Sequence, residues 1–227
     1  MLAAAARRPL QLQTAMHLFL VVLGGRSRGC HIEQHDVRFV AGGRIEDTLP
    51  QLRRQWFGLQ RGLHLDSWLQ VRQVEGWRVE LRPEPFTGPQ RLWFINVGAY
   101  DPDCPWELHA FGLFVADTAA AAKAQAKRRL LVGAAQQHKD DSCAVETVAA
   151  SGPTGGAAAS TAVNQPPLPG MAGTGTETGP QPDDVLALQR LGRWHVHLLP
   201  QPGSDSAWRP LRPDWFGYRR LDRAGDG

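Results

Sequence analysis

The chain has 227 residues and a formal net charge of +3, from 25 lysines and arginines against 22 aspartates and glutamates. This length suits one ordinary domain or two small ones, and a hydrophobic content of 42% allows a packed core. The weak charge speaks against nucleic-acid binding, because the most basic stretch, residues 209–223, also carries Asp214 and Asp222. An odd cysteine count of three speaks against a disulfide framework, so we expect a cytoplasmic protein.

Residues 1–15 are expected to form a disordered N-terminal extension. Arg7 and Arg8 followed by the apolar run 16–24 imitate a signal peptide. The run is too short to span a bilayer, which takes roughly 20 residues. It also has a counterpart inside the chain at 92–97, so we interpret it as a buried strand and expect no membrane segment.

The first predicted repeat covers 16–90. Apolar runs predict strands over 18–23 and 37–41. A helix should follow from near Thr48, because Pro50 either delays its start or bends it. Alternating apolar residues predict a closing hairpin, with strands 68–74 and 77–81 around a Glu75-Gly76 turn.

A second copy of the same pattern covers 91–227. Strands are predicted over 92–97 and 113–116, followed by an Ala-rich helix over 119–132 that is capped by Thr118 and ended by Gly133. The closing hairpin is predicted over 185–191 and 194–198. Polar residues recur at an offset of 74 between the copies, as in Glu33 and Glu107, but the hairpins are 117 apart, as in Trp77 and Trp194.

The difference of 43 residues between the two offsets predicts an insertion. It coincides with 142–182, a stretch rich in Gly, Ala, Ser, Thr and Pro that holds no lysine or arginine. Such a composition cannot bury enough surface to offset the entropy of ordering, so we expect it to be disordered. The predicted fold class is α+β, with two pseudo-symmetric strand-strand-helix-strand-strand repeats, about eight strands and two helices around a shared core.

Several motifs carry a resemblance to a known family. The segments Ile32–Ala41, Leu63–Trp68, Trp106–Ala116 and Gln137–Asp140 resemble the bacterial domain of unknown function 1543, and the likeness covers most of 16–141 and 183–218. The resemblance implies a small, soluble bacterial protein with a duplicated layout. No activity is established for that family, so the resemblance assigns no catalytic residue.

Duplicated Glu-x-His and His-x-Asp pairs are the candidate metal ligands. Residues two apart in an extended chain project to the same side, so each pair can present both side chains together. We expect each pair to lie on a connection, between two strands or between helix and hairpin. Imidazoles with carboxylates suit zinc, iron or manganese. The candidates are Glu33, His35, His64 and Asp66 in the first copy and Glu107, His109, His138 and Asp140 in the second.

Three roles remain open for these residues. Structural anchoring is the favoured one, because a histidine beside a carboxylate often only ties down a turn. A small-ligand or partner site comes second, and a metal or catalytic site third, since no spacing matches His-Glu-x-x-His. His195 and His197 are expected on the wet face of a strand, and Gly24-Gly25 with Arg26 is a weak phosphate-loop candidate.

The sequence therefore predicts a non-catalytic module that binds an unidentified small molecule or protein, without membrane association. The alternative is a metal-binding protein or metal-dependent hydrolase that uses the duplicated pairs. No cofactor is identified beyond a candidate divalent metal, and enzymatic activity is left open.

Overall fold

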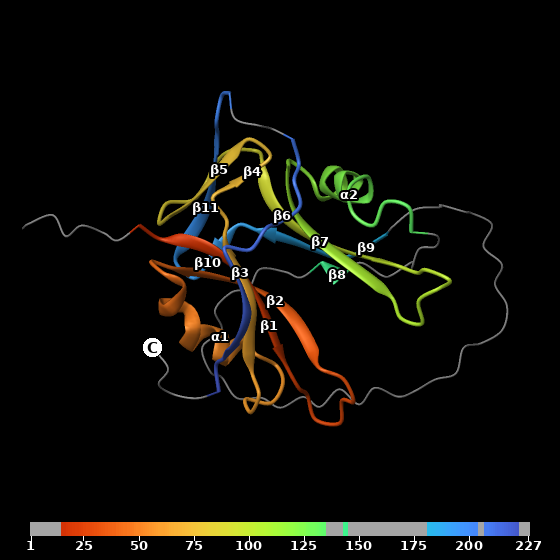
Figure 1. The fold of residues 1–227 in the computed structure, drawn as a ribbon. Helices are drawn as coiled ribbons and strands as arrows, with labels where there is room; N and C mark the ends of the chain where they lie inside the picture. Colours follow the sequence, from red (N-terminus) through yellow and green to blue (C-terminus); the bar gives the residue numbers. More distant parts are fainter. Residues whose placement is uncertain (1–14, 135–142, 145–180, 204–206, 223–227) are drawn as a thin grey trace, which may run out of the picture.

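The computed structural model describes residues 15–134, 143–144, 181–203 and 207–222. Fourteen of the fifteen residues of the predicted N-terminal extension lie outside these ranges, as do 142 and 145–180 of the predicted insertion. Twelve strands, two α-helices and one 3-10 helix are formed by the described residues (Figure 1). None of these helices is long and apolar enough to cross a membrane.

The first sheet has the strand order β12-β3-β1-β2, and all its neighbouring strands are antiparallel. Its strands are β1 (His17–Gly25), β2 (Gln34–Gly42), β3 (His64–Gln70) and β12 (Trp215–Arg220). The 3-10 helix Ile45–Thr48 leads into α1 (Leu49–Gln55), where Pro50 occupies the first turn and breaks no hydrogen bond. Helix α1 covers one face of the sheet through Leu52, which packs with Phe19, Val21 and Leu23 of β1.

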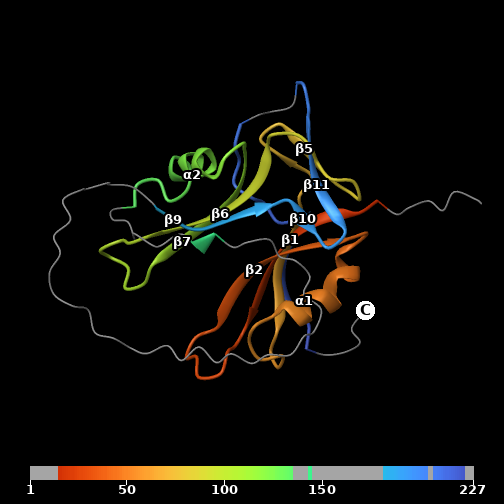
Figure 2. The same ribbon diagram turned by 180° about the vertical axis from the view of Figure 1, so that it is seen from behind.

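The second sheet has the order β7-β6-β9-β8. Its strands are β6 (Arg91–Ala99), β7 (Leu108–Ala116), β8 (Cys143–Ala144) and β9 (Gln181–Leu188). Helix α2 (Ala119–Lys127) covers one face and buries Ala122 and Ala126 against Ile95 and Phe114. The view from behind shows α2 and α1 on separate sheets, far from one another (Figure 2).

A third sheet joins the two halves of the chain. Its order is β10-β11-β5-β4, from β4 (Gln73–Val74), β5 (Trp77–Arg82), β10 (Arg190–Leu191) and β11 (Trp194–Pro200). Strands β5 and β11 pair antiparallel with Glu80 opposite His197. These two residues are 117 positions apart, the hairpin offset, so a local pseudo-twofold axis passes between them. The predicted shared core lies here: Leu18 and Leu20 of β1 pack in one cluster with Leu92 and Phe94 of β6.

Strand pairing follows the sequence offsets in the two outer sheets. Gly24 pairs with His35 between β1 and β2, and Gly98 pairs with His109 between β6 and β7, each pair shifted by 74. The irregularity at Val22/Leu23 of β1 recurs at Asn96/Val97 of β6. Corresponding strands of the halves therefore share one register.

The structure corrects several expectations. The twelve strands exceed the predicted eight, because β3/β4 and β9/β10 are each interrupted, and because β8 and β12 were not expected. Helix α2 ends at Lys127 instead of 132. Residues 143–144 and 181–182, assigned to the disordered insertion, lie in paired strands. His197 is buried instead of wet, because its Nε2 lies 2.7 Å from the Glu84 carbonyl oxygen and Phe86 packs on its ring.

Candidate functional site

The four first-copy candidates come together on one face of the first sheet. His35 lies on β2, with Glu33 just before that strand, and His64 and Asp66 lie on β3. The expectation that each pair lies on a connection is wrong for His64 and Asp66, because β3 already begins at His64, and for His35, because it lies within β2; Glu33 lies on the connection. The i and i+2 spacing still puts each pair on one side, as extended chain requires.

Gly24 on β1 makes this convergence possible. It pairs with His35 on one side and with His64 on the other, so the two histidines flank a residue that has no side chain. A Cβ at this position would lie 2.4 Å from His64 Nε2 and 2.8 Å from Asp66 Oδ2. The imidazole and carboxylate therefore occupy the space above Gly24, which explains this glycine better than a phosphate loop does.

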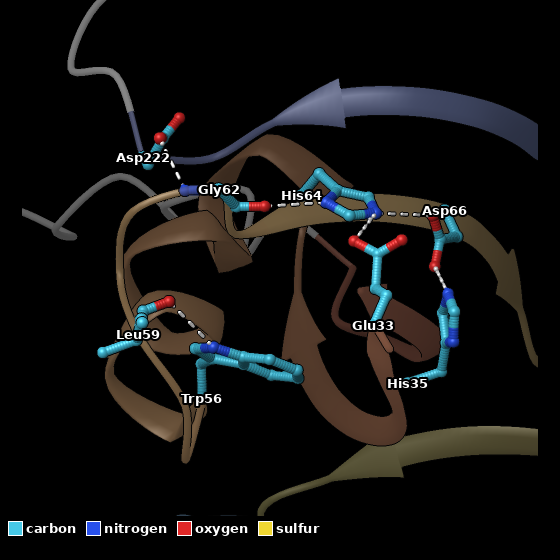
Figure 3. A network of polar contacts seen from close by, with 8 residues as sticks. All are labelled: Glu33, His35, Trp56, Leu59, Gly62, His64, Asp66 and Asp222. Atoms are coloured by element: carbon cyan, nitrogen blue, oxygen red, sulfur yellow. Dashed lines mark hydrogen bonds and ion pairs between the residues drawn. The ribbon is translucent and has the colours of Figure 1, made fainter. Parts of the chain in front are cut away.

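His64 is the centre of the cluster (Figure 3). Its Nε2 lies 3.1 Å from Asp66 Oδ1 and 3.3 Å from Glu33 Oε1. The second oxygen of Asp66, Oδ2, lies 3.4 Å from His35 Nε2. Ligand atoms of Glu33, His35 and His64 all fall within 4.8 Å of one another.

Exposure differs sharply among these side chains. His64 is only 2% exposed, whereas Glu33 and His35 are 39% and 55% exposed. Asp66 is partly buried, and burial is the largest cause that raises the pKa of its carboxyl. The nearby His64 and His35 act in the opposite direction, and Glu33 adds to the rise. The site thus has a fixed, covered inner side and an outer side that solvent reaches.

The orientation of the His64 ring is set by the backbone. Nδ1 lies 2.8 Å from the carbonyl oxygen of Gly62 (Figure 3). A carbonyl can only accept, so Nδ1 carries the hydrogen and donates it. In the neutral imidazole, Nε2 is then the unprotonated nitrogen, and its lone pair faces the carboxylates of Glu33 and Asp66.

The second copy is different. Glu107 and His109 lie together, with Glu107 Oε2 3.5 Å from His109 Nε2, and the Asn96 amide nitrogen lies 3.4 Å from His109 Nδ1. His138 and Asp140 lie outside the described residues. In the strand register, Gly98 pairs with Gln181 where Gly24 pairs with His64. Within the described ranges, the first copy holds the single group of three or more candidate metal ligands.

Residues that the sequence reasoning missed complete the surroundings of His64. Gly62, Tyr218 and Asp222 all contact His64 or the residues that hold it. Gly62 could have been suspected, since glycine is the usual residue where a turn needs a positive φ, here +84°. Tyr218 and Asp222 are more than 150 positions away along the chain, and no local pattern links them to His64.

Comparisons with known proteins agree with the duplicated arrangement. Residues 30–81 and 104–151 each match the model of the family described as Domain of Unknown Function (DUF1543). The chain is also similar to the crystal structure of a protein Il1583 from Idiomarina loihiensis, with 28% identity and a TM-score of 0.57. That match covers 93% of this chain and 99% of the other. No curated protein matches. Both halves of the chain are thus similar to the Domain of Unknown Function (DUF1543) family, as the sequence motifs predict.

Proposed function

We propose that this protein is a metal-binding module that holds one zinc-type divalent ion in its first repeat. The ligands are His64 Nε2, Glu33 and His35, with Asp66 beside His64 Nε2. The observation that carries the proposal is the Nε2 lone pair of His64, which faces carboxylate oxygens at 3.1 Å and 3.3 Å. An unprotonated Nε2 cannot face two carboxylate oxygens at such distances unless a proton or a metal ion lies among them, and we propose that a metal ion does.

The spacing of the ligand atoms supports a small tetrahedral ion. In a zinc site with bonds of about 2.0–2.1 Å, neighbouring ligand atoms lie about 3.3–3.4 Å apart. Glu33 Oε1 to His64 Nε2 is 3.3 Å, and Asp66 Oδ1 to His64 Nε2 is 3.1 Å. Calcium and magnesium take oxygen ligands, so a buried imidazole at the centre favours a transition metal.

The backbone contact of His64 also supports this role. A histidine that binds metal nearly always donates its other ring N–H to a carbonyl or carboxylate, which fixes the tautomer and raises the basicity of the ligand. The Gly62 carbonyl takes that position on His64 Nδ1. The residues whose ligand atoms lie close enough to share one ion are Glu33, His35 and His64. We propose metal binding by these three and assign no catalytic residue.

Zinc titration by calorimetry tests the proposal on protein purified without a histidine tag. His64→Ala removes the central ligand. It should weaken zinc binding by more than ~100-fold, which is the upper cost of losing a residue that only hydrogen-bonds to a ligand. His35→Ala should weaken binding at least about 10-fold.

The matched control is His109→Ala, which removes the second-copy counterpart of His35 and should leave zinc affinity unchanged. A wild-type protein that takes up no more zinc than His64→Ala would contradict the proposal. In that case a proton on Nε2 supplies the positive charge, and the cluster only anchors the strands.

A further inference from the structure

We propose that the C-terminal segment 215–222, which contains β12, supports this metal site. Its residues Asp222 and Tyr218 are positioning residues that fix the ring of His64. The inference rests on the proposed function, because the ring it fixes is the proposed central ligand. Neither residue touches the metal. Each acts through His64 or through the residue that holds it.

Asp222 acts through Gly62. Its Oδ2 accepts a hydrogen bond of 2.8 Å from the Gly62 backbone N–H, and the carbonyl of that same residue accepts from His64 Nδ1 (Figure 3). Gly62 has a φ of +84°, which lies outside the range of a regular strand. Its conformation therefore depends on hydrogen bonds such as the one from its N–H to Asp222. Asp222 is held in turn by two hydrogen bonds from Arg220, of 2.9 Å and 2.6 Å.

The chain just after β12 is hydrogen-bonded to the residues at the start of β3. The Leu221 N–H donates to the Leu63 carbonyl at 2.8 Å, one residue after Gly62. Arg53 of α1 donates to the Leu221 carbonyl at 2.5 Å. The chain on both sides of the Gly62 carbonyl is therefore tied to β12 or to the residues that follow it.

Tyr218 acts on the ring itself. Its ring centroid lies 4.1 Å from that of His64, with a tilt of 32° between the planes. The register of β12 against β3 shifts between Phe216 and Arg219, and this irregularity contains Tyr218. One face of the imidazole is thereby covered, which limits rotation of the His64 side chain.

Within the described residues, the edge strands of the two outer sheets differ. The second sheet carries β8 at the corresponding edge, and β8 runs parallel to its neighbour, whereas β12 runs antiparallel to β3. Residues 215–222 lie outside both segments that match the family model. Gly24 of β1 also lies outside them, so the site combines residues of segment 30–81 with β1 and with the C-terminal segment.

The test compares Asp222→Leu with Asp214→Leu in the full chain. Asp214 is a matched control, because its carboxylate accepts from the Gln70 N–H at 2.7 Å and from Arg72 at 2.9 Å at the opposite end of the same strand pair. Asp222→Leu should weaken zinc binding about 10–100-fold, the usual effect of losing an outer partner. Asp214→Leu should change zinc affinity by less than about threefold. Equal losses in the two variants, or none in Asp222→Leu, would overturn the proposal.

A spectroscopic readout separates positioning from folding. Nitrogen-15 shifts of His64 in the zinc-free wild type should show the tautomer with hydrogen on Nδ1, and Asp222→Leu should shift the signals toward the mixture of a free imidazole. Asp222→Asn keeps an acceptor for the Gly62 N–H and should restore both the tautomer and most of the zinc affinity. If Asp222→Leu keeps the wild-type nitrogen-15 shifts of His64, the proposed role of Asp222 is wrong. Because this measurement needs no zinc, it can fail or succeed independently of the proposed metal binding.

The ring contact is tested with Tyr218→Phe and Tyr218→Ala. Phe keeps the ring stacked on His64 and should keep the affinity, whereas Ala should weaken zinc binding severalfold. Phe216→Ala removes another exposed ring of β12 and should change nothing. A loss in Tyr218→Phe as large as that in Tyr218→Ala would show that the hydroxyl, not the ring, matters, and would overturn this part of the proposal.

Discussion

At the scale of single residues, Gly24 shows how the sequence permits the site. It lies between two histidines on neighbouring strands, and any side chain there would occupy the position of the His64 imidazole. Strands rarely keep glycine in their interior, because it weakens them, and its presence often marks a close approach of other atoms. Here the approaching atoms are His64 Nε2 and Asp66 Oδ2.

Gly24→Ala should therefore displace the His64 ring. We expect a loss of about 1–3 kcal/mol in the free energy of unfolding, the usual cost of overpacking, together with loss of zinc binding. Urea denaturation and zinc calorimetry measure the two effects. In a His64→Ala background the contacts with the imidazole are gone and Asp66 Oδ2 alone remains close, so the same change should cost less. An equal cost in both backgrounds would show that the two side chains do not compete for this space.

The sequence singles out the two first-copy pairs that the structure brings together, but it does not show how the strands do so. Spacing alone is enough to pair Glu33 with His35 and His64 with Asp66, because alternation in extended chain is a local property. It cannot show that β1 brings the two pairs together over Gly24, since that depends on strand order. Nor can it show that Asp222 stabilises the Gly62 backbone, because long-range contacts leave no local pattern.

At the scale of elements, the apolar sequence patterns of the central strands are easy to recognise, because these strands bury side chains along their whole length. The run over β1 is apolar on both faces, since one face meets α1 and the other meets the shared core. The terminal strand β12 has no such signal: Phe216 and Tyr218 are 78% and 64% exposed. A strand stabilised at an edge by hydrogen bonds and ion pairs does not show the alternation by which a strand is recognised.

Helix α2 provides a test at this scale. Thr118 precedes its first residue, and its Oγ1 accepts a hydrogen bond of 3.2 Å from the Ala121 N–H. Thr118→Ala should lower the free energy of unfolding by about 1 kcal/mol, the usual cost of losing an N-cap. Urea denaturation measures it. Thr118→Ser keeps the hydroxyl and should stay near the wild type; a loss equal to that of alanine would show that the cap contributes nothing.

At the scale of the whole molecule, the halves are joined by their closing hairpins. Glu75, at the turn between β4 and β5, has a positive φ of 48°, an unfavourable conformation for a residue other than glycine. Its side chain reaches the other half, where Oε2 accepts from the Val115 N–H at 2.8 Å and Oε1 pairs with Arg129. Contacts across the two halves therefore hold this turn.

Glu75→Ala should destabilise the fold by about 1–3 kcal/mol, because it leaves the Val115 N–H without its acceptor and removes the carboxylate partner of Arg129, which keeps its bond to Gln125. Chemical denaturation checks the value. Glu84→Ala, on an exposed side chain nearby, should stay within about 0.5 kcal/mol of the wild type. A similar, small effect in both variants would mean that the halves are held by apolar packing alone.

At this scale the repeated offsets predict two similar halves, and residues 30–81 and 104–151 both match the family model. The sequence does not predict how the halves are joined, because the pattern within each hairpin does not indicate which strand of the other hairpin it pairs with. Pairing of β5 with β11 is a contact between residues about 117 positions apart, and only the folded chain displays it.

The most direct measurement of the central claim is anomalous X-ray diffraction at the zinc edge, from crystals of the tagless protein grown with zinc. We expect one strong peak per chain, about 2.0–2.1 Å from His64 Nε2 and within bonding distance of Glu33 and His35. No peak should lie at His109. A peak only at His109 or elsewhere on the surface, or no peak within about 3 Å of His64 Nε2, would contradict the claim.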